Sequence, residues 1–188
     1  MPDPLAPVSP LGGFSRDFAG ARLREPEDLA IVALALPLGE EAAALAAIGA
    51  GFSAAPPAVG RSALSADGAF RLLRLGQDQL FVLFQRPTPD AEAVVARKIG
   101  AAAWITDQTD VWAALELSGP LARAALARIC PLDLDPRAFG PDAVARTIME
   151  HLGTIVARTG EDAFLLLSAS SSARSFLHAV ETSIEYVQ

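Results

Sequence analysis

The sequence predicts an α+β fold made of two similar halves, each with an antiparallel sheet and helices on one face. Three observations lead to this prediction. Short apolar runs of strand length alternate with alanine- and leucine-rich segments of helical composition. Two hairpins share a Gly-(Gln/Glu)-Asp turn, and each hairpin precedes a segment with helix-starting residues. Each half therefore follows a β-α-β-β-α-type order.

Residues 1–20 are predicted to form an extended arm before the first half. Proline has no backbone N–H and fixes its own backbone, and this segment is dense in proline and glycine. In a complex such an arm lies along a partner, whereas in isolation it is disordered. The residues concerned are Pro2, Pro4, Pro7, Pro10, Gly12 and Gly13.

Residues 21–106 are predicted to form the first half. Pro37 ends an apolar strand, and acidic residues in the first turn favour a helix after it because they oppose the helix dipole. Thr88 and Pro89 provide an N-cap and a first helical residue for a second helix. The predicted elements are a strand at 29–36, a helix at 40–48, a loop at 54–60, a hairpin at 70–75 and 79–84, a helix ending at Lys98 and a strand at 101–106.

Residues 107–188 are predicted to form the second half on the same plan. Gly119 and Pro120 begin its first helix, and Pro131 follows the end of that helix. The serines at 170–172 precede its last helix. The predicted elements are a strand at 111–117, a helix at 119–130, a proline-bounded loop at 132–141, strands at 144–151, 154–158 and 163–167, and a helix ending near Tyr186.

An internal repeat supports the division into halves. The segment from Arg74 to Leu83 resembles the segment from Arg158 to Leu167, with Gly76 and Gly160 offset by 84 residues. Each segment reads as a strand, a tight turn and an apolar strand. The strand and helix at 29–48 correspond roughly to those at 111–129.

Composition indicates a partner interface and argues against several classes of function. Apolar residues make up 52% of the chain and charged residues only 20%, which indicates apolar surface that a permanent partner covers. The alternative is an alanine-rich composition without any patch. The net charge of −7 and a single lysine, Lys98, argue against nucleic-acid binding. No signal peptide or membrane span is visible, so we expect a soluble cytoplasmic protein.

No arrangement of residues in the sequence points to a catalytic or metal centre. His151 and His178 have no cysteine or carboxylate at metal-ligand spacing. Cys130, the only cysteine, has no histidine nearby in sequence to act as its base, so we expect a buried apolar thiol. The glycine pairs lack the strand–turn–helix context of a phosphate-binding loop.

Acidic and aromatic residues around the middle of the chain offer candidate contacts. Asp107 and Asp110 lie on one connection between strands, where they either orient a ligand or cation or bond to nearby backbone N–H groups. Trp104 and Trp112 flank this connection and belong either to a partner surface or to the core. Further on, the carboxylates of Asp133 and Asp135 either face solvent or pair with Arg137 or with a partner.

An ordered series of motifs resembles the gamma subunit of heterotetrameric sarcosine oxidase. The resemblance is closer in the second half than in the first. That family is similar in fold to the folate-binding part of aminomethyltransferases of the glycine cleavage system, which agrees with the internal repeat. The motifs are SPLGG at 9–13, WITDQTD at 104–110, LSGP at 117–120, CPLDL at 130–134, RAF at 137–139 and ARSF at 173–176.

The resemblance implies a structural subunit of an enzyme that oxidatively demethylates sarcosine to glycine. The products are hydrogen peroxide and either formaldehyde or 5,10-methylenetetrahydrofolate. It implies alpha, beta and delta subunits as partners, with FAD, FMN, NAD, tetrahydrofolate and zinc held by those subunits. No catalytic, cofactor-binding or metal-binding residue is expected on this chain. The residues expected at the partner interface are Trp104, Asp107, Asp110, Arg137 and Phe139.

Two alternatives stay open at this point. The first is a standalone folate-binding module or aminomethyltransferase-like fragment, in which an acidic side chain anchors the pteridine; Asp107, Asp110 and Asp162 are the candidates. The sequence lacks the Lys-Gly-Cys-x-x-Gly-Gln signature of related folate-dependent proteins, and this counts against that alternative. The second is an interaction domain of another complex.

Overall fold

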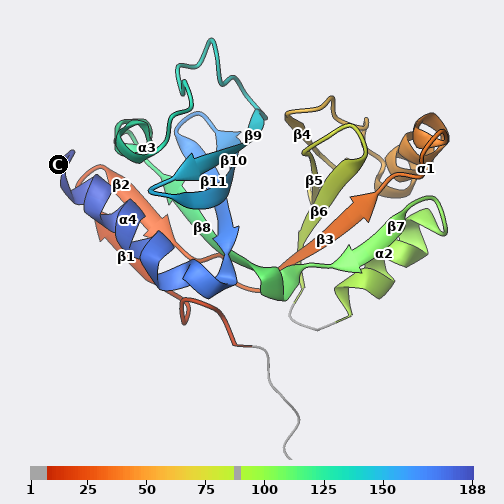
Figure 1. Cartoon of the computed structure of the whole chain (residues 1–188), viewed down its shortest axis with the longest axis horizontal. Coiled ribbons are helices and arrows are strands. Elements are labelled where there is room, and N and C mark those ends of the chain that lie inside the picture. The colour runs from red at the N-terminus through yellow and green to blue at the C-terminus, as the bar shows by residue number, and fades with distance from the viewer. Residues whose placement is uncertain (1–7, 87–89) are drawn as a thin grey trace, which may run out of the picture.

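The computed structural model describes residues 8–86 and 90–188 of the chain, which form two antiparallel sheets and four α-helices (Figure 1). The predicted α+β class is therefore confirmed. The predicted N-cap Thr88 and its neighbour Pro89 lie outside the described residues. Among the described helices, none combines the length and apolar character that crossing a membrane requires.

Sheet B holds the strands of the first half in the order β4-β5-β6-β3-β7. All its neighbouring strands are antiparallel. Its helices α1 and α2 pack on one face, where they cover the even-numbered apolar residues of β3 and β6. The bounds are β3 (Leu29–Ala35), α1 (Glu41–Phe52), β4 (Arg61–Leu64), β5 (Phe70–Arg74), β6 (Gln79–Gln85), α2 (Ala91–Ile99) and β7 (Trp104–Asp107).

Sheet A holds the strands of the second half and a hairpin from the N-terminal region, in the order β1-β2-β8-β11-β10-β9. Helices α3 and α4 cover one of its faces. The bounds are β1 (Ser15–Phe18), β2 (Ala21–Arg24), η1 (Thr109–Val111), β8 (Trp112–Ser118), α3 (Ala122–Ile129), β9 (Val144–Met149), β10 (Leu152–Gly160), β11 (Ala163–Ala169), η2 (Ser170–Ser172) and α4 (Ala173–Glu185).

The two sheets pack face to face, so the order of layers is helices, sheet, sheet, helices (Figure 1). The third apolar cluster lies between the sheets and includes Ile31, Phe81, Ile155 and Leu165. Because the central strands are buried on both faces, they are apolar at nearly every position rather than at alternate ones. This arrangement explains the continuous apolar runs in the sequence.

The internal repeat appears in the structure as an approximate two-fold relation between the halves. Ser62 N donates to Asp142 O at 2.7 Å and Val144 N donates to Gly60 O at 2.8 Å, on either side of the bridge between Arg61 and Ala143. In each half the four shared strands follow one spatial order: β4, β5, β6, β3 in sheet B correspond to β9, β10, β11, β8 in sheet A.

One arginine in each half supports its hairpin turn in the same way. Arg158 donates from Nε, Nη2 and Nη1 to the carbonyl oxygens of Gly160, Glu161 and Phe139 at 3.0, 2.8 and 2.9 Å. Arg74 makes the corresponding bonds to the carbonyls of Gly76, Gln77 and Pro57 at 3.4, 3.0 and 3.4 Å. The repeat thus extends to the arginine side chains that hold the turns. The hydrogen bonds of Arg158 in the second half are shorter than those of Arg74 in the first half.

The N-terminal region differs from the prediction, because residues 15–24 form a hairpin within sheet A. The predicted arm at 1–20 includes β1, and β2 pairs with β8 of the second half. The segment before β1 is also held: the buried Glu25 carboxylate accepts from Leu11 N at 3.1 Å and from Gly13 N at 2.8 Å. Sequence reasoning missed β1, β2 and β4, each of four residues, because strands so short carry little periodic signal.

Candidate partner-binding surface

The edge of sheet B carries the most exposed tryptophan of the chain. Trp104 begins the edge strand β7, lies opposite the exposed Ala35 and is 75% exposed. Leu38 follows β3 just beyond Ala35 and is 97% exposed. A large aromatic side chain left in solvent on an edge strand is typical of an interaction surface, so the predicted role of Trp104 is compatible with its position.

Trp112 occupies a different environment from Trp104. Its ring packs edge-on against Phe81 at a centroid distance of 5.7 Å, in the layer between the sheets. Its indole Nε1 is buried and has no hydrogen-bond partner among the described residues. Of the two alternatives raised for the tryptophans, Trp112 therefore belongs to the core and Trp104 to the surface.

Of the two acidic residues at the end of β7 and after it, only Asp107 uses its carboxylate within the turn. The Asp107 carboxylate accepts from Thr109 N at 2.9 Å, and Thr109 Oγ1 accepts from Ile31 N at 3.1 Å. The carbonyl of Asp110 accepts from Ser170 Oγ at 2.8 Å, so this connection also joins η1 to η2. The side chain of Asp110 lies at the exposed surface.

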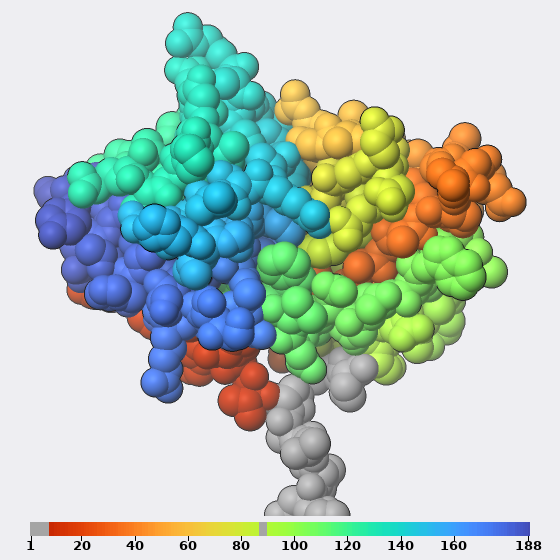
Figure 2. Space-filling view, in the orientation of Figure 1, coloured from red at the N-terminus to blue at the C-terminus, as the bar shows by residue number. Residues whose placement is uncertain are grey.

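The loop between α3 and β9 projects from the body of the molecule (Figure 2). Arg137, in this loop, is exposed and donates from Nε and Nη2 to the Asp135 carboxylate at 2.9 and 3.1 Å. This hydrogen bonding lowers the pKa of Asp135. Phe139, by contrast, is only 7% exposed and packs in the core of the second half. The Phe139 side chain is therefore not available on the surface of this loop, whereas Arg137 is.

Three arginines from different elements hold this loop by its backbone. Arg123 Nη1 donates to Leu134 O at 3.2 Å, Arg158 Nη1 to Phe139 O at 2.9 Å, and Arg61 Nη1 to Pro141 O at 3.0 Å. The three carbonyl groups lie outside any helix or strand, so these arginine side chains supply the hydrogen bonds that regular secondary structure would otherwise provide. The loop and the Trp104 edge lie on different halves of the molecule (Figure 1), so the expected interface residues do not form one contiguous site.

The other residues considered as candidates are dispersed. His151 lies in the turn between β9 and β10, and His178 is exposed on α4. Cys130 is buried, with its Sγ 3.9 Å from Thr147 Oγ1. Asp162 accepts from Arg123 Nη2 at 2.8 Å. Within residues 8–86 and 90–188, no group of three or more histidine, cysteine or acidic side chains is placed to hold a metal ion.

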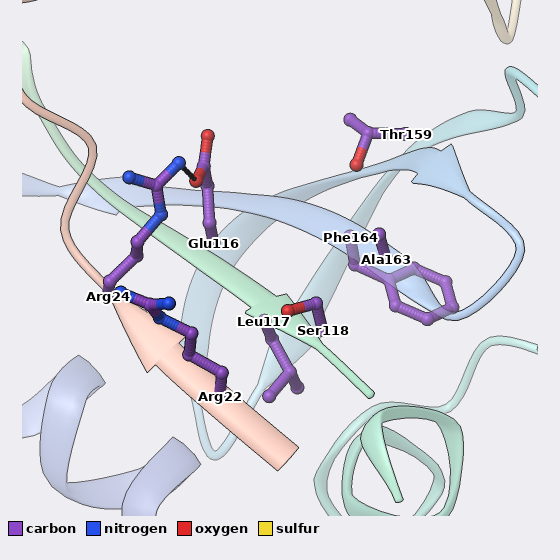
Figure 3. A pocket seen from close by; sticks show the side chains of 8 residues that line it. All are labelled: Arg22, Arg24, Glu116, Leu117, Ser118, Thr159, Ala163 and Phe164. Carbon is purple, nitrogen blue, oxygen red and sulfur yellow. Dashed lines mark ion pairs between the residues drawn. The ribbon is translucent and has the colours of Figure 1, made fainter. Parts of the chain in front are cut away.

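A shallow depression of about 350 Å³ lies beside β2, β8 and the β10–β11 turn (Figure 3). Arg24 and Glu116 form an ion pair on its floor, and Arg22 is paired with Asp17 at 3.5 Å. Its two arginines are therefore already matched by carboxylates within the chain. The lining residues are Arg22, Arg24, Glu116, Leu117, Ser118, Thr159, Ala163 and Phe164.

Comparisons with known proteins agree with the resemblance found in the sequence. No family model matches the chain. The sarcosine oxidase gamma subunit of Arthrobacter sp. is 35% identical over 126 residues, which are 67% of this chain and 60% of that protein. The gamma subunit of Corynebacterium sp. strain P-1 is 33% identical over 140 residues, 74% of this chain and 67% of that protein. The chain thus spans about two thirds or less of the length of these curated relatives.

Solved structures show the same relationship. A chain of heterotetrameric sarcosine oxidase from Corynebacterium sp. U-96, in complex with pyrrole 2-carboxylate, aligns with a TM-score of 0.76 and 25% identity, covering 88% of this chain and 84% of that chain. Aminomethyltransferase T of the glycine cleavage system from Bartonella henselae aligns with a TM-score of 0.66 and 16% identity, covering 94% of this chain and 57% of that one. The second likeness is one of fold alone.

Proposed function

The chain belongs to the family of sarcosine oxidase gamma subunits, and from this premise we propose that it is a non-catalytic subunit of a heterotetrameric sarcosine oxidase. The observation that carries the proposal is the sequence identity to curated gamma subunits along most of the chain. The exposed edge around Trp104 supports it, because a permanent subunit needs apolar surface for its partners.

The proposed partners are the alpha, beta and delta subunits of the enzyme. In the assembly, sarcosine loses its N-methyl group to give glycine, and dioxygen is reduced to hydrogen peroxide. The one-carbon unit leaves as formaldehyde or passes to tetrahydrofolate as 5,10-methylenetetrahydrofolate. FAD, FMN, NAD, tetrahydrofolate and zinc are proposed to be held by the other subunits. The contribution of this chain is to contact and support them from a cytoplasmic complex.

Co-expression tests this proposal. The full chain, tagged, is produced together with alpha, beta and delta subunits of sarcosine oxidase and purified through its own tag. We expect a yellow complex that forms peroxide from sarcosine. A colourless chain purified without companions would contradict the proposal and would favour the folate-binding alternative, with Asp107, Asp110 or Asp162 as the anchor. Titration with tetrahydrofolate would then decide whether this chain binds folate unaided.

We predict that Trp104→Ala weakens assembly and leaves the isolated fold intact. Truncating a buried aromatic anchor at an interface costs about 2–4 kcal/mol, which corresponds to a loss of affinity of roughly 30-fold or more. The isolated chain should keep its denaturation midpoint, because Trp104 is largely exposed there. The measurement is the fraction of the large subunits that co-purifies with the tagged variant.

Tyr186→Ala provides the matched control for that variant. Tyr186 is a second aromatic residue in solvent, 71% exposed and located after α4 on the opposite half of the molecule. Its ring lies 4.9 Å from the Arg128 guanidinium. If both variants assemble as well as the wild type, the surface around Trp104 is not part of the interface.

A further inference from the structure

Sheet A has six strands and sheet B has five, and the additional strand of sheet A lies at one edge. Outside the four strands that the halves share, sheet B has β7 beside β3, and sheet A has β2 beside β8 in the corresponding place. Both pairings are antiparallel. Beyond β2 lies a further strand, β1, whereas in the described residues no strand lies beyond β7. Sheet B therefore has an open edge where sheet A is extended (Figure 1).

The correspondence can be followed residue by residue. In sheet A, Ser118 pairs with Ala163 and also with Arg22. In sheet B, Ala35 pairs with Gln79 and also with Trp104. Trp104 therefore takes the place of Arg22, and the residue that faces Arg22 on the outer strand is Asp17. In the part of the chain that the structure describes, no strand faces Trp104 from the outer side, and the outer position opposite it is the counterpart of the position that Asp17 fills.

The backbone of β7 presents hydrogen-bonding groups toward the outer position opposite Trp104. Gln108 N donates to Ile31 O at 2.8 Å, which continues the β3–β7 ladder by one pair. Since bonded and non-bonded pairs alternate in an antiparallel ladder, Thr106 and Trp104 direct their backbone groups to β3, and Ile105 and Asp107 direct theirs outward. In the described part of the chain, no hydrogen bond to those outward groups is found.

The side chains at this edge also fit an added strand. Trp104, which is 75% exposed, lies at the start of β7, and Ile105 is half-buried against the core under α2. An exposed edge with apolar side chains is a template for another strand, and proteins usually protect such an edge with charge, proline or a covering element. The positions of β7 with outward backbone groups are Ile105 and Asp107, and the one charge there, the Asp107 carboxylate, accepts a hydrogen bond from Thr109 N within the turn.

We propose that an extended segment of a partner subunit adds to this edge, antiparallel to β7, in the place that β1 occupies in sheet A. This inference rests on the proposed function, because it specifies how one partner of the complex binds. Main-chain hydrogen bonds to Ile105 and Asp107 give affinity, and alternate side chains give specificity. The segment carries an apolar side chain opposite Trp104 and contains no proline where its N–H faces β7.

Hydrogen exchange in the assembled enzyme tests the proposal directly. The amides of Ile105 and Asp107 are expected to exchange rapidly in the isolated chain and to become protected in the co-expressed complex. The amides of Thr106 and Trp104 bond to β3 and serve as an internal comparison. Complex formation without added protection at Ile105 and Asp107 would overturn this inference and leave the proposed function standing.

A matched pair of variants gives a second test. Ile105→Pro removes the outward N–H and projects a ring toward the incoming strand, whereas Ile105→Ala removes a similar amount of side chain and keeps the N–H. We expect Ile105→Pro to bind the partner subunits about tenfold more weakly than Ile105→Ala. Equal binding of the two variants would count against strand addition.

The outcomes separate the two proposals. If the wild-type chain does not assemble with the sarcosine oxidase subunits, the proposed function fails and this inference fails with it. If the isolated chain forms a dimer in which Ile105 and Asp107 are protected, the edge belongs to a second copy of the chain and the partner-segment proposal is wrong. Protection confined to the complex, together with the proline effect, is the expected result.

Discussion

Replacing Arg158 by methionine is expected to destabilise the chain by about 3 kcal/mol or more, because it removes a buried cation around which three carbonyl groups are arranged. Arg158 is only 5% exposed, and it joins the β10–β11 turn to the loop after α3. Methionine fills much of the same volume and has no donor, so the buried Phe139 carbonyl is left without a partner. The charge-assisted bonds to the carbonyls of Gly160 and Glu161 at the exposed turn are also lost. Urea denaturation of the isolated chain measures the loss.

The repeat supplies the control for this prediction. Arg74 has the same position in the first half, but it is half-buried and two of its three bonds are 3.4 Å long. Arg74→Met should therefore cost about 1 kcal/mol, because its acceptors can turn to water and the bonds are long. Equal losses for the two variants would show that burial of the arginine does not determine its contribution.

Replacing Gly119 by alanine is expected to destabilise the chain by about 2–5 kcal/mol, through two effects at one residue. Gly119 has a φ of +112°, which disfavours any residue with a Cβ. A Cβ at this position would also lie 2.6 Å from Gly20 O and 3.0 Å from Ala21 Cα. The end of β8 thus approaches the β1–β2 turn too closely for a side chain.

Two other glycines separate the backbone strain at Gly119 from the steric clash. Gly68 has a φ of +72°, and no atom lies within 4 Å of the place where an alanine Cβ would be, so Gly68→Ala reports strain alone, about 1 kcal/mol. Gly153 has neither problem, and Gly153→Ala should have almost no effect. The measurement is the denaturant midpoint of each variant. A loss at Gly119 no larger than that at Gly68 would mean that the hairpin moves aside at little cost.

Much of the fold can be predicted from local pattern, because the strands that are apolar on both faces leave a strong signal. The runs around Leu34, Leu83 and Leu166 are predicted as strands and form strands, and the paired Gly-(Gln/Glu)-Asp turns place the hairpins correctly. The stacking of the two sheets is absent from the prediction. It follows from the same runs, since a strand apolar on both faces needs a layer on each side.

The candidate surface is harder to predict, because exposure at an edge depends on which strands are neighbours. Trp104 and Trp112 have similar sequence surroundings, yet one lies on an open edge and the other between sheets. Phe139 is expected from the sequence to contact a partner, and its side chain is instead an anchor of the loop that carries Arg137. The position of β2 depends on pairing with β8, a long-range contact that leaves no mark in its own four residues.

The pairing of β2 with β8 has a consequence for how the protein is made. The N-terminal hairpin leaves the ribosome long before residues 112–118. Until those residues follow, β2 has only β1 as a neighbour, and its apolar residues Ala21 and Leu23 lack the core that the second half supplies. The first half can fold while the chain is still growing, but the second sheet has to wait until almost the whole chain has been translated. During that interval both the hairpin and the face of sheet B that packs against sheet A are exposed on the nascent chain.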